Sequence, residues 1–84
     1  MLLVVEVSDT TLARDLNVKL PRYARADVPE LWIVDVAGAA IERFTDPDPT
    51  GHYTTHHRFS PGDTVHSVTL PDLRLCVTEV LSQA

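Results

Sequence analysis

The fold is decided by residues 2–36, which read LLVVEVSDTTLARDLNVKLPRYARADVPELWIVDV. Two short aliphatic runs, Leu2 to Val7 and Leu31 to Val36, flank a segment in which leucines recur every four residues. The runs are too short for helices and have the character of strands buried on both faces, whereas the leucine spacing indicates an amphipathic helix. A helix that joins two strands forms a crossover, so the two strands are predicted to pair in parallel.

The central helix has recognisable ends in the sequence. Residues 8–11 offer hydroxyl and carboxylate groups for N-capping, so the helix is expected to begin at about Leu12 and to end near Ala26. Pro21 falls on its solvent side and is expected to kink or restart the helix. Residues 27–30 are predicted to form a turn. The apolar stripe that should face the sheet consists of Leu12, Leu16, Leu20 and Tyr23.

The second half of the chain is predicted to add antiparallel strands. Residues 40–44 alternate apolar and polar side chains, as a half-exposed strand does. Residues 46–51 are rich in turn-forming residues and are predicted to form a loop. Residues 52–59 can then form the second strand of an antiparallel hairpin. A short strand is expected within 64–68 and a terminal helical turn within 77–81. The sequence therefore predicts an α/β fold, a strand-helix-strand unit followed by antiparallel strands.

Composition limits the class of protein. The chain has 84 residues, which is enough for one domain, and its single cysteine, Cys76, leaves no partner for an internal disulfide. Cysteine usage predicts a cytoplasmic protein, and no apolar run approaches the roughly 18 residues that a membrane span needs. The net charge of −5 disfavours binding to nucleic acid outside a local basic patch. A metal-dependent nuclease is not excluded, because its cation can recruit the substrate locally.

Three charged residues stand where apolar ones are expected. Glu6 interrupts an aliphatic strand, and Lys19 projects within about 60° of the centre of the apolar stripe, with Asp15 at its edge. One interpretation is a partly buried Glu6–Lys19 ion pair with Asp15 as the ordinary i,i+4 partner of Lys19. The other is a carboxylate and a lysine gathered at a metal site. The pattern by itself leaves both interpretations open.

The remaining candidate residues favour structural roles. His52, His56 and His57 form a cluster without a nearby cysteine, and adjacent strand residues point to opposite faces, so we expect exposed, solvated histidines. Trp32 and Tyr23 lie within apolar periodic segments and are predicted to be core aromatics.

Several separately placed segments resemble one known family. They are Leu3-Val4-Val5-Glu6-Val7-Ser8, then Asp15 and Lys19 with Tyr23-Ala24-Arg25-Ala26, then Val28-Pro29-Glu30-Leu31-Trp32-Ile33-Val34-Asp35, then Phe59-Ser60-Pro61-Gly62-Asp63, and last Leu70-Pro71-Asp72-Leu73. In this order they resemble the Uma-two family of restriction endonucleases, which belongs to the PD-(D/E)XK nuclease superfamily. The resemblance implies a partial restriction-endonuclease-like core and metal-dependent hydrolysis of DNA phosphodiesters.

The resemblance also implies roles for the three charged residues. Glu6 matches the acidic, metal-binding residue of the (D/E)XK element, and Ser8 stands where the lysine of that element would be. Lys19 matches the lysine that this family carries on the following helix, and Asp15 matches the helix aspartate. The implied catalytic residues are Glu6, Lys19 and Asp15, and the implied metal is Mg²⁺, which prefers carboxylate oxygens.

The sequence departs from the family pattern at its start. Family members carry a helix and strands before the equivalent of Leu2, including a Pro-Asp strand whose aspartate is the other metal ligand. We therefore expect residues 1–84 to form a single partial domain, the C-terminal portion of the fold, with little activity alone. Alternatives are a noncatalytic binding or assembly module, including a homo-oligomer, and an unrelated α/β domain. The first strand is expected to present an unpaired edge or an uncovered apolar face.

Overall fold

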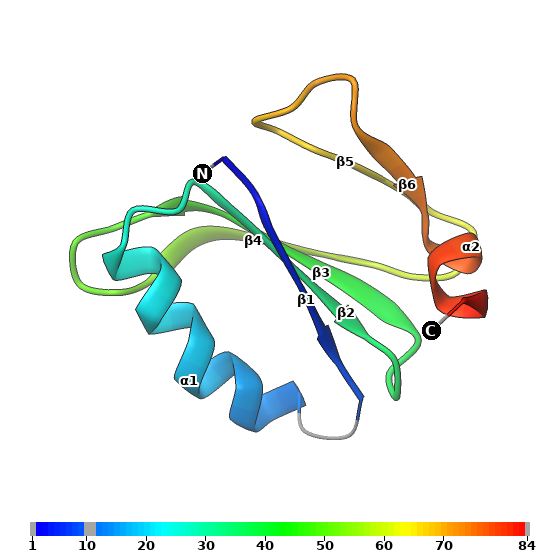
Figure 1. Cartoon of the computed structure of the whole chain (residues 1–84), viewed down its shortest axis with the longest axis horizontal. Helices are drawn as coiled ribbons and strands as arrows, with labels where there is room; N and C mark the ends of the chain where they lie inside the picture. The colour runs from blue at the N-terminus through cyan, green and yellow to red at the C-terminus, as the bar shows by residue number, and fades with distance from the viewer. Residues whose placement is uncertain (1, 10–11, 84) are drawn as a thin grey trace.

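A computed structural model describes residues 2–9 and 12–83 of the chain. Figure 1 shows a twisted sheet with a long helix against it and a smaller hairpin-and-helix unit beside it. In chain order the elements are β1 (Val4–Ser8), α1 (Leu12–Arg25), β2 (Glu30–Asp35), β3 (Ala40–Pro47), β4 (Tyr53–Phe59), β5 (Thr64–His66), β6 (Arg74–Cys76) and α2 (Val77–Ser82).

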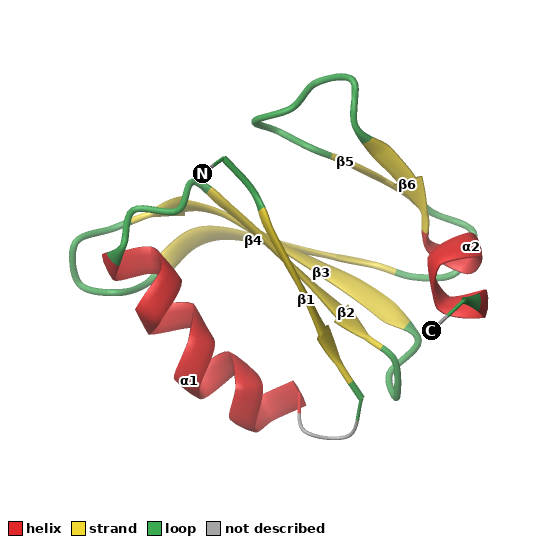
Figure 2. Ribbon diagram, in the orientation of Figure 1, coloured by secondary structure: helices red, strands yellow, loops and turns green. Residues whose placement is uncertain are grey.

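The main sheet has the strand order β1-β2-β3-β4. β1 pairs with β2 in parallel, while β2 with β3 and β3 with β4 are antiparallel, so the predicted strand-helix-strand unit and the antiparallel strands after it are confirmed. β5 and β6 form a separate two-stranded sheet. This mixed α/β architecture is consistent with a restriction-endonuclease-like fold. The secondary structure along the chain can be followed in Figure 2.

The sheet carries one apolar cluster on each face. Leu31, Ile33 and Phe44 point to one face, where Leu16, Leu20 and Tyr23 of α1 pack against them. Trp32, Val34 and Ile41 point to the other face, where they meet Val65, Val77 and partly buried residues of the β5–β6 hairpin and α2. Because side chains alternate along a strand, covering both faces buries every residue of β2.

Two predictions about burial were wrong. β1 was expected to be buried on both faces, but Val5 and Val7 are 49% and 61% exposed. Among the described strands β1 pairs with β2 alone, and its two exposed valines lie on one face, so the expectation of an unpaired edge or an uncovered apolar face is confirmed. β3 was expected to be half-exposed, but most of it is buried, Glu42 included, because the sheet is covered on both sides.

Helix α1 ends in a hydrogen-bonded cap. The N–H of Val28 donates to the carbonyl of Tyr23 at 3.1 Å and the N–H of Asp27 to that of Ala24 at 3.0 Å. Asp27 has φ of 58°, the left-handed conformation that closes a Schellman motif. The helix runs through Pro21 without a break, so the expected restart does not occur. One missing N–H is tolerated here because the other backbone bonds of the helix and its packing on the sheet remain.

Glu30 corrects the predicted turn over residues 27–30. It is the first residue of β2 and has 0% exposed surface. Its Oε2 accepts hydrogen bonds from Trp32 Nε1 at 2.8 Å and from the Val68 N–H at 3.0 Å. Its Oε1 accepts from Ser67 Oγ at 2.6 Å and from the N–H and Oγ1 of Thr69 at 3.1 and 2.8 Å. This carboxylate therefore fixes the loop between β5 and β6 against the sheet.

Candidate active site

The candidate site lies where α1 crosses the edge strand β1. Glu6 projects from β1 on the face of the sheet that α1 covers, beside Ile33 of β2. Lys19 Nζ donates to Glu6 Oε2 at 2.9 Å, and the two side chains are only 29% and 25% exposed. The expected contact across the helix-sheet interface is thus confirmed. It arises because the phase of the helix that buries its leucines also turns Lys19 toward the sheet.

Tyr23 completes a cluster that the sequence did not predict. Its hydroxyl donates to the second oxygen of the same carboxylate, Glu6 Oε1. Lys19 and Tyr23 are four residues apart, which places both on one face of α1. This spacing was the available signal, but the apolar surroundings of Tyr23 favoured a core role. The ring does pack on the core, and its hydroxyl reaches the carboxylate.

The electrostatics keep Tyr23 protonated. Its hydrogen bond to Glu6, followed by burial and the negative charge of Glu6, raises the pKa of the hydroxyl above 10.0, and the positive charges of Lys19 and Arg22 oppose this rise. A neutral Tyr23 and a charged Lys19 both serve as donors to Glu6. The cluster therefore holds the carboxylate in one orientation at the edge of the sheet.

A second polar cluster lies further across the same face of the sheet. The two buried carboxylates of Glu42 and Asp35 share Arg58: Nη1 of Arg58 bonds to Glu42 Oε2 and lies 3.5 Å from Asp35 Oδ2. His56 Nε2 lies 2.5 Å from the other oxygen of Glu42, and the ring stacks on Phe44 with centroids 4.3 Å apart. His56 is exposed as expected, but it also contacts Glu42 and Phe44, which the sequence did not predict.

The other two histidines do not join this cluster. His52 hydrogen-bonds through Nδ1 to Thr50 Oγ1 at 2.9 Å in the loop before β4. His57 lies opposite Arg43, on the sheet face away from Glu42. Both are exposed, and the structure does not bring the three histidines together at one site.

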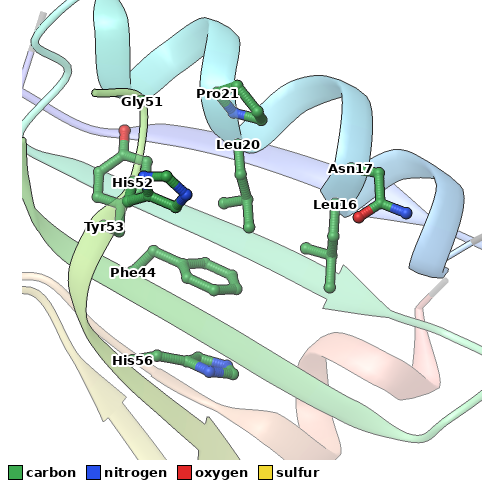
Figure 3. Close-up of a pocket in the computed structure, with 9 residues that line it drawn as sticks. All are labelled: Leu16, Asn17, Leu20, Pro21, Phe44, Gly51, His52, Tyr53 and His56. Atoms are coloured by element: carbon green, nitrogen blue, oxygen red, sulfur yellow. The ribbon is translucent and has the colours of Figure 1, made fainter. Parts of the chain in front are cut away.

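A pocket of about 300 Å³ opens between α1 and β4. Figure 3 shows Leu16 and Leu20 of α1 above Phe44, with Tyr53 and His56 around it. The hydroxyl of Tyr53 donates to the Val28 carbonyl at 2.7 Å and thereby ties β4 to the end of α1. Glu6, Lys19 and Tyr23 do not line this pocket, so it is separate from the candidate site.

The candidate site has the chemistry of part of a magnesium site. Glu6 offers one carboxylate, and the side chain of Asp15 lies outside the described residues. Within residues 2–9 and 12–83, no group of three or more His, Cys, Asp and Glu side chains is arranged to hold a metal ion. Mg²⁺ is commonly bound through one or two carboxylates, with substrate phosphates and waters completing its shell. Glu6 fits one position in such a shell.

Comparison with known proteins identifies the family. The family model Uma2, described as "Putative restriction endonuclease", matches residues 1–78. The chain belongs to the Uma2 family. This membership confirms the resemblance seen in the sequence and removes the alternative of an unrelated α/β domain. At the level of the family, Uma2 membership supports a nuclease-like function.

No curated protein and no solved structure matches this Uma2 chain. Within the described residues, no helix is long and apolar enough to cross a membrane.

Proposed function

We propose that this Uma2 chain carries part of the active site of a Mg²⁺-dependent DNA endonuclease, with Glu6, Lys19 and Asp15 as its catalytic residues. The observation that carries the proposal is the Glu6 carboxylate held at the strand edge by Lys19 and Tyr23, in a family of restriction endonucleases.

Glu6 acts in the proposal as the metal ligand. Its carboxylate oxygens are hard ligands of the kind that Mg²⁺ prefers, and Lys19 and Tyr23 each donate a hydrogen bond to one of them. When bound, Mg²⁺ polarises the phosphoryl group and lowers the pKa of a bound water. Tyr23, which stays neutral, is a positioning residue that fixes the direction of the Glu6 oxygens.

Lys19 supplies positive charge beside the scissile phosphate. Its ammonium lies 2.9 Å from Glu6 Oε2, and negative charge develops on the phosphoryl oxygens as the water attacks. Asp15 precedes Lys19 by one helical turn and matches the helix aspartate of the family. Its proposed role is to orient the Lys19 ammonium as the i,i+4 partner of that residue.

We further propose that cleavage requires a metal-binding carboxylate beyond the described residues. Glu6 alone gives weak affinity for Mg²⁺, because a single protein carboxylate leaves most of the shell to water. Residues 1–84 would then form one part of the nuclease domain, and DNA cleavage by this chain alone should stay at background.

The test is a calorimetric titration of the chain with Mn²⁺ and Mg²⁺, with plasmid nicking measured alongside. We expect weak cation binding that Glu6→Gln abolishes. Glu79→Gln, which changes an exposed glutamate on α2, is the matched control and should leave binding unchanged. Equal cation affinity in the wild type and Glu6→Gln, or nicking that survives Glu6→Gln, would overturn the site.

A second candidate function is an assembly module, and the exposed edge of β1 favours it. Val5 and Val7 present an exposed apolar strip on a strand that pairs with β2 alone among the described strands, and such an edge is a template for strand addition. Sedimentation velocity over a range of protein concentrations tests this candidate. Growth in sedimentation coefficient with concentration supports assembly, and a constant monomer value counts against it.

A further inference from the structure

Helix α1 is basic in an acidic chain. It carries four of the seven Lys and Arg residues but only one of the twelve Asp and Glu residues. Lys19 is engaged with Glu6 at the candidate site. The other three, Arg14, Arg22 and Arg25, are all exposed. We call these three residues the arginine stripe.

The stripe occupies the outer face of α1. At about 100° per residue, Arg25 lies ~20° and Arg22 ~80° around the helix axis from Arg14. Leu16 and Leu20, which pack on the sheet, lie on the opposite side of the helix. The packing that buries the leucines therefore turns Arg14 and Arg22 toward solvent, whereas the exposed side chain of Arg25 lies beside Gly51 in the loop between β3 and β4.

No ion pair among the described residues neutralises the stripe. The ion pairs in the described part of the molecule engage Lys19, His52, His56 and Arg58, and none engages an arginine of the stripe. Neighbouring like charges on a helix repel one another by a few tenths of a kcal/mol. Within the described residues these three arginines form no ion pair, so a chain with net charge −5 presents here a local surface suited to a polyanion.

The stripe is continuous with the candidate site. Arg22 directly precedes Tyr23 and lies one turn beyond Lys19 on α1. At about 100° and ~1.5 Å per residue, Arg22 lies ~60° around the helix axis and ~4.5 Å along it from Lys19. A strand of nucleic acid lying along the stripe would therefore pass beside Glu6.

We propose that the arginine stripe of α1 binds the phosphate backbone of duplex DNA and guides it to the Glu6–Lys19 site; this inference rests on the proposed function. Arg14 and Arg25 are eleven residues apart, about 16 Å along the helix at ~1.5 Å per residue. One DNA strand places a phosphate every ~3.4 Å along the duplex axis, so the stripe spans about five phosphates. The contacts are to phosphate and carry no sequence information.

The test is fluorescence anisotropy of a labelled random-sequence duplex with the full 84-residue chain, without divalent metal, over a series of NaCl concentrations. The variants are Arg22→Gln and the combined Arg14→Gln, Arg22→Gln, Arg25→Gln. Arg74→Gln, at an exposed position on β6, is the matched control. Circular dichroism and Tm confirm that each variant is folded.

Each lost phosphate contact should lower the slope of log K against log salt by about 0.9, so the combined variant should lose about 3 from the slope. Arg74→Gln should match the wild type. No binding of the wild type at low salt, equal slopes for the wild type and the combined variant, or an equal loss in Arg74→Gln would overturn the inference. Arginine-dependent binding to phosphatidylserine vesicles but not to duplex would assign the stripe to a membrane and overturn it as well.

The two proposals fail in different ways. If the stripe variants bind DNA normally while Glu6→Gln still abolishes cation binding, only the stripe is wrong. If DNA binding depends on the stripe while Glu6→Gln leaves cation binding unchanged, the catalytic assignment is wrong.

Discussion

Glu30 gives the sharpest quantitative prediction, because its carboxylate is buried and ionised. Burial alone raises the pKa of Glu30, but hydrogen bonds from Ser67, Trp32 and the backbone N–H groups of Thr69 and Val68 outweigh it. Together they lower the pKa from 4.5 to about 2. The folded state therefore holds the ionised form far more strongly than the unfolded state does.

The size of the effect follows from linkage between protonation and folding. Each unit of pKa corresponds to about 1.4 kcal/mol, so the fall from 4.5 to about 2 stabilises the folded state by about 3 kcal/mol. Because the folded pKa is the lower one, this stability is fully present above about pH 5 and is lost as the pH falls toward 2. Domains of this size are stable by only about 5–15 kcal/mol in total, so the loss should be easy to measure.

The perturbation is Glu30→Gln, measured by urea unfolding with the fluorescence of Trp32, the single tryptophan. Both oxygens of Glu30 accept hydrogen bonds. In the glutamine variant an NH₂ group replaces one of these oxygens, so a donor faces the donors that the oxygen had bound. We expect the variant to be less stable than the wild type by about 3 kcal/mol near pH 7, and the difference to shrink toward about pH 3.

Glu79→Gln is the matched control for a change at an exposed glutamate. It should leave the free energy of unfolding within about 0.5 kcal/mol of the wild-type value at every pH. The variant has no carboxyl at position 30 to take up a proton, so its stability should fall less than that of the wild type as the pH is lowered. An equal loss of stability in the two proteins would refute the role of Glu30.

Three further outcomes are expected. Arg58→Met should lower the free energy of unfolding in urea by about 2 kcal/mol, because it leaves the buried Glu42 carboxylate without its arginine; an unchanged midpoint would contradict this. Val7→Lys, which places a charge on the exposed edge strand, should reduce any concentration-dependent sedimentation without lowering Tm, and equal self-association in both proteins would remove β1 as the interface. In a spectrophotometric titration, Tyr23 should ionise above 10.0, and Glu6→Gln should bring that ionisation back toward 10.0, since the hydrogen bond and charge of Glu6 raise its pKa; identical titrations would contradict the contact.

The sequence by itself determined the strand-helix-strand unit and the contact between Glu6 and Lys19. Both depend on local periodicity. The apolar spacing of α1 sets the rotation of the helix against the sheet, and that rotation carries Lys19 toward the strand that holds Glu6. The burial of the second strand was also predictable from the sequence, because an unbroken apolar run such as residues 31–34 has apolar side chains on both of its faces.

Only the tertiary structure decided the environments that depend on distant segments. Glu30 has the local sequence of a turn, and it became a buried anchor because the loop at Ser67 to Thr69 folds over it. Glu42 lies in an alternating strand that looks half-exposed, but it is buried, and Arg58 and His56 of the neighbouring strand contact its carboxylate. The role of the Tyr23 hydroxyl likewise depends on Glu6, which accepts its hydrogen bond across the interface between α1 and the sheet. Periodicity fixes which way a side chain points, whereas its partner and burial depend on chain segments that only the folded topology brings there.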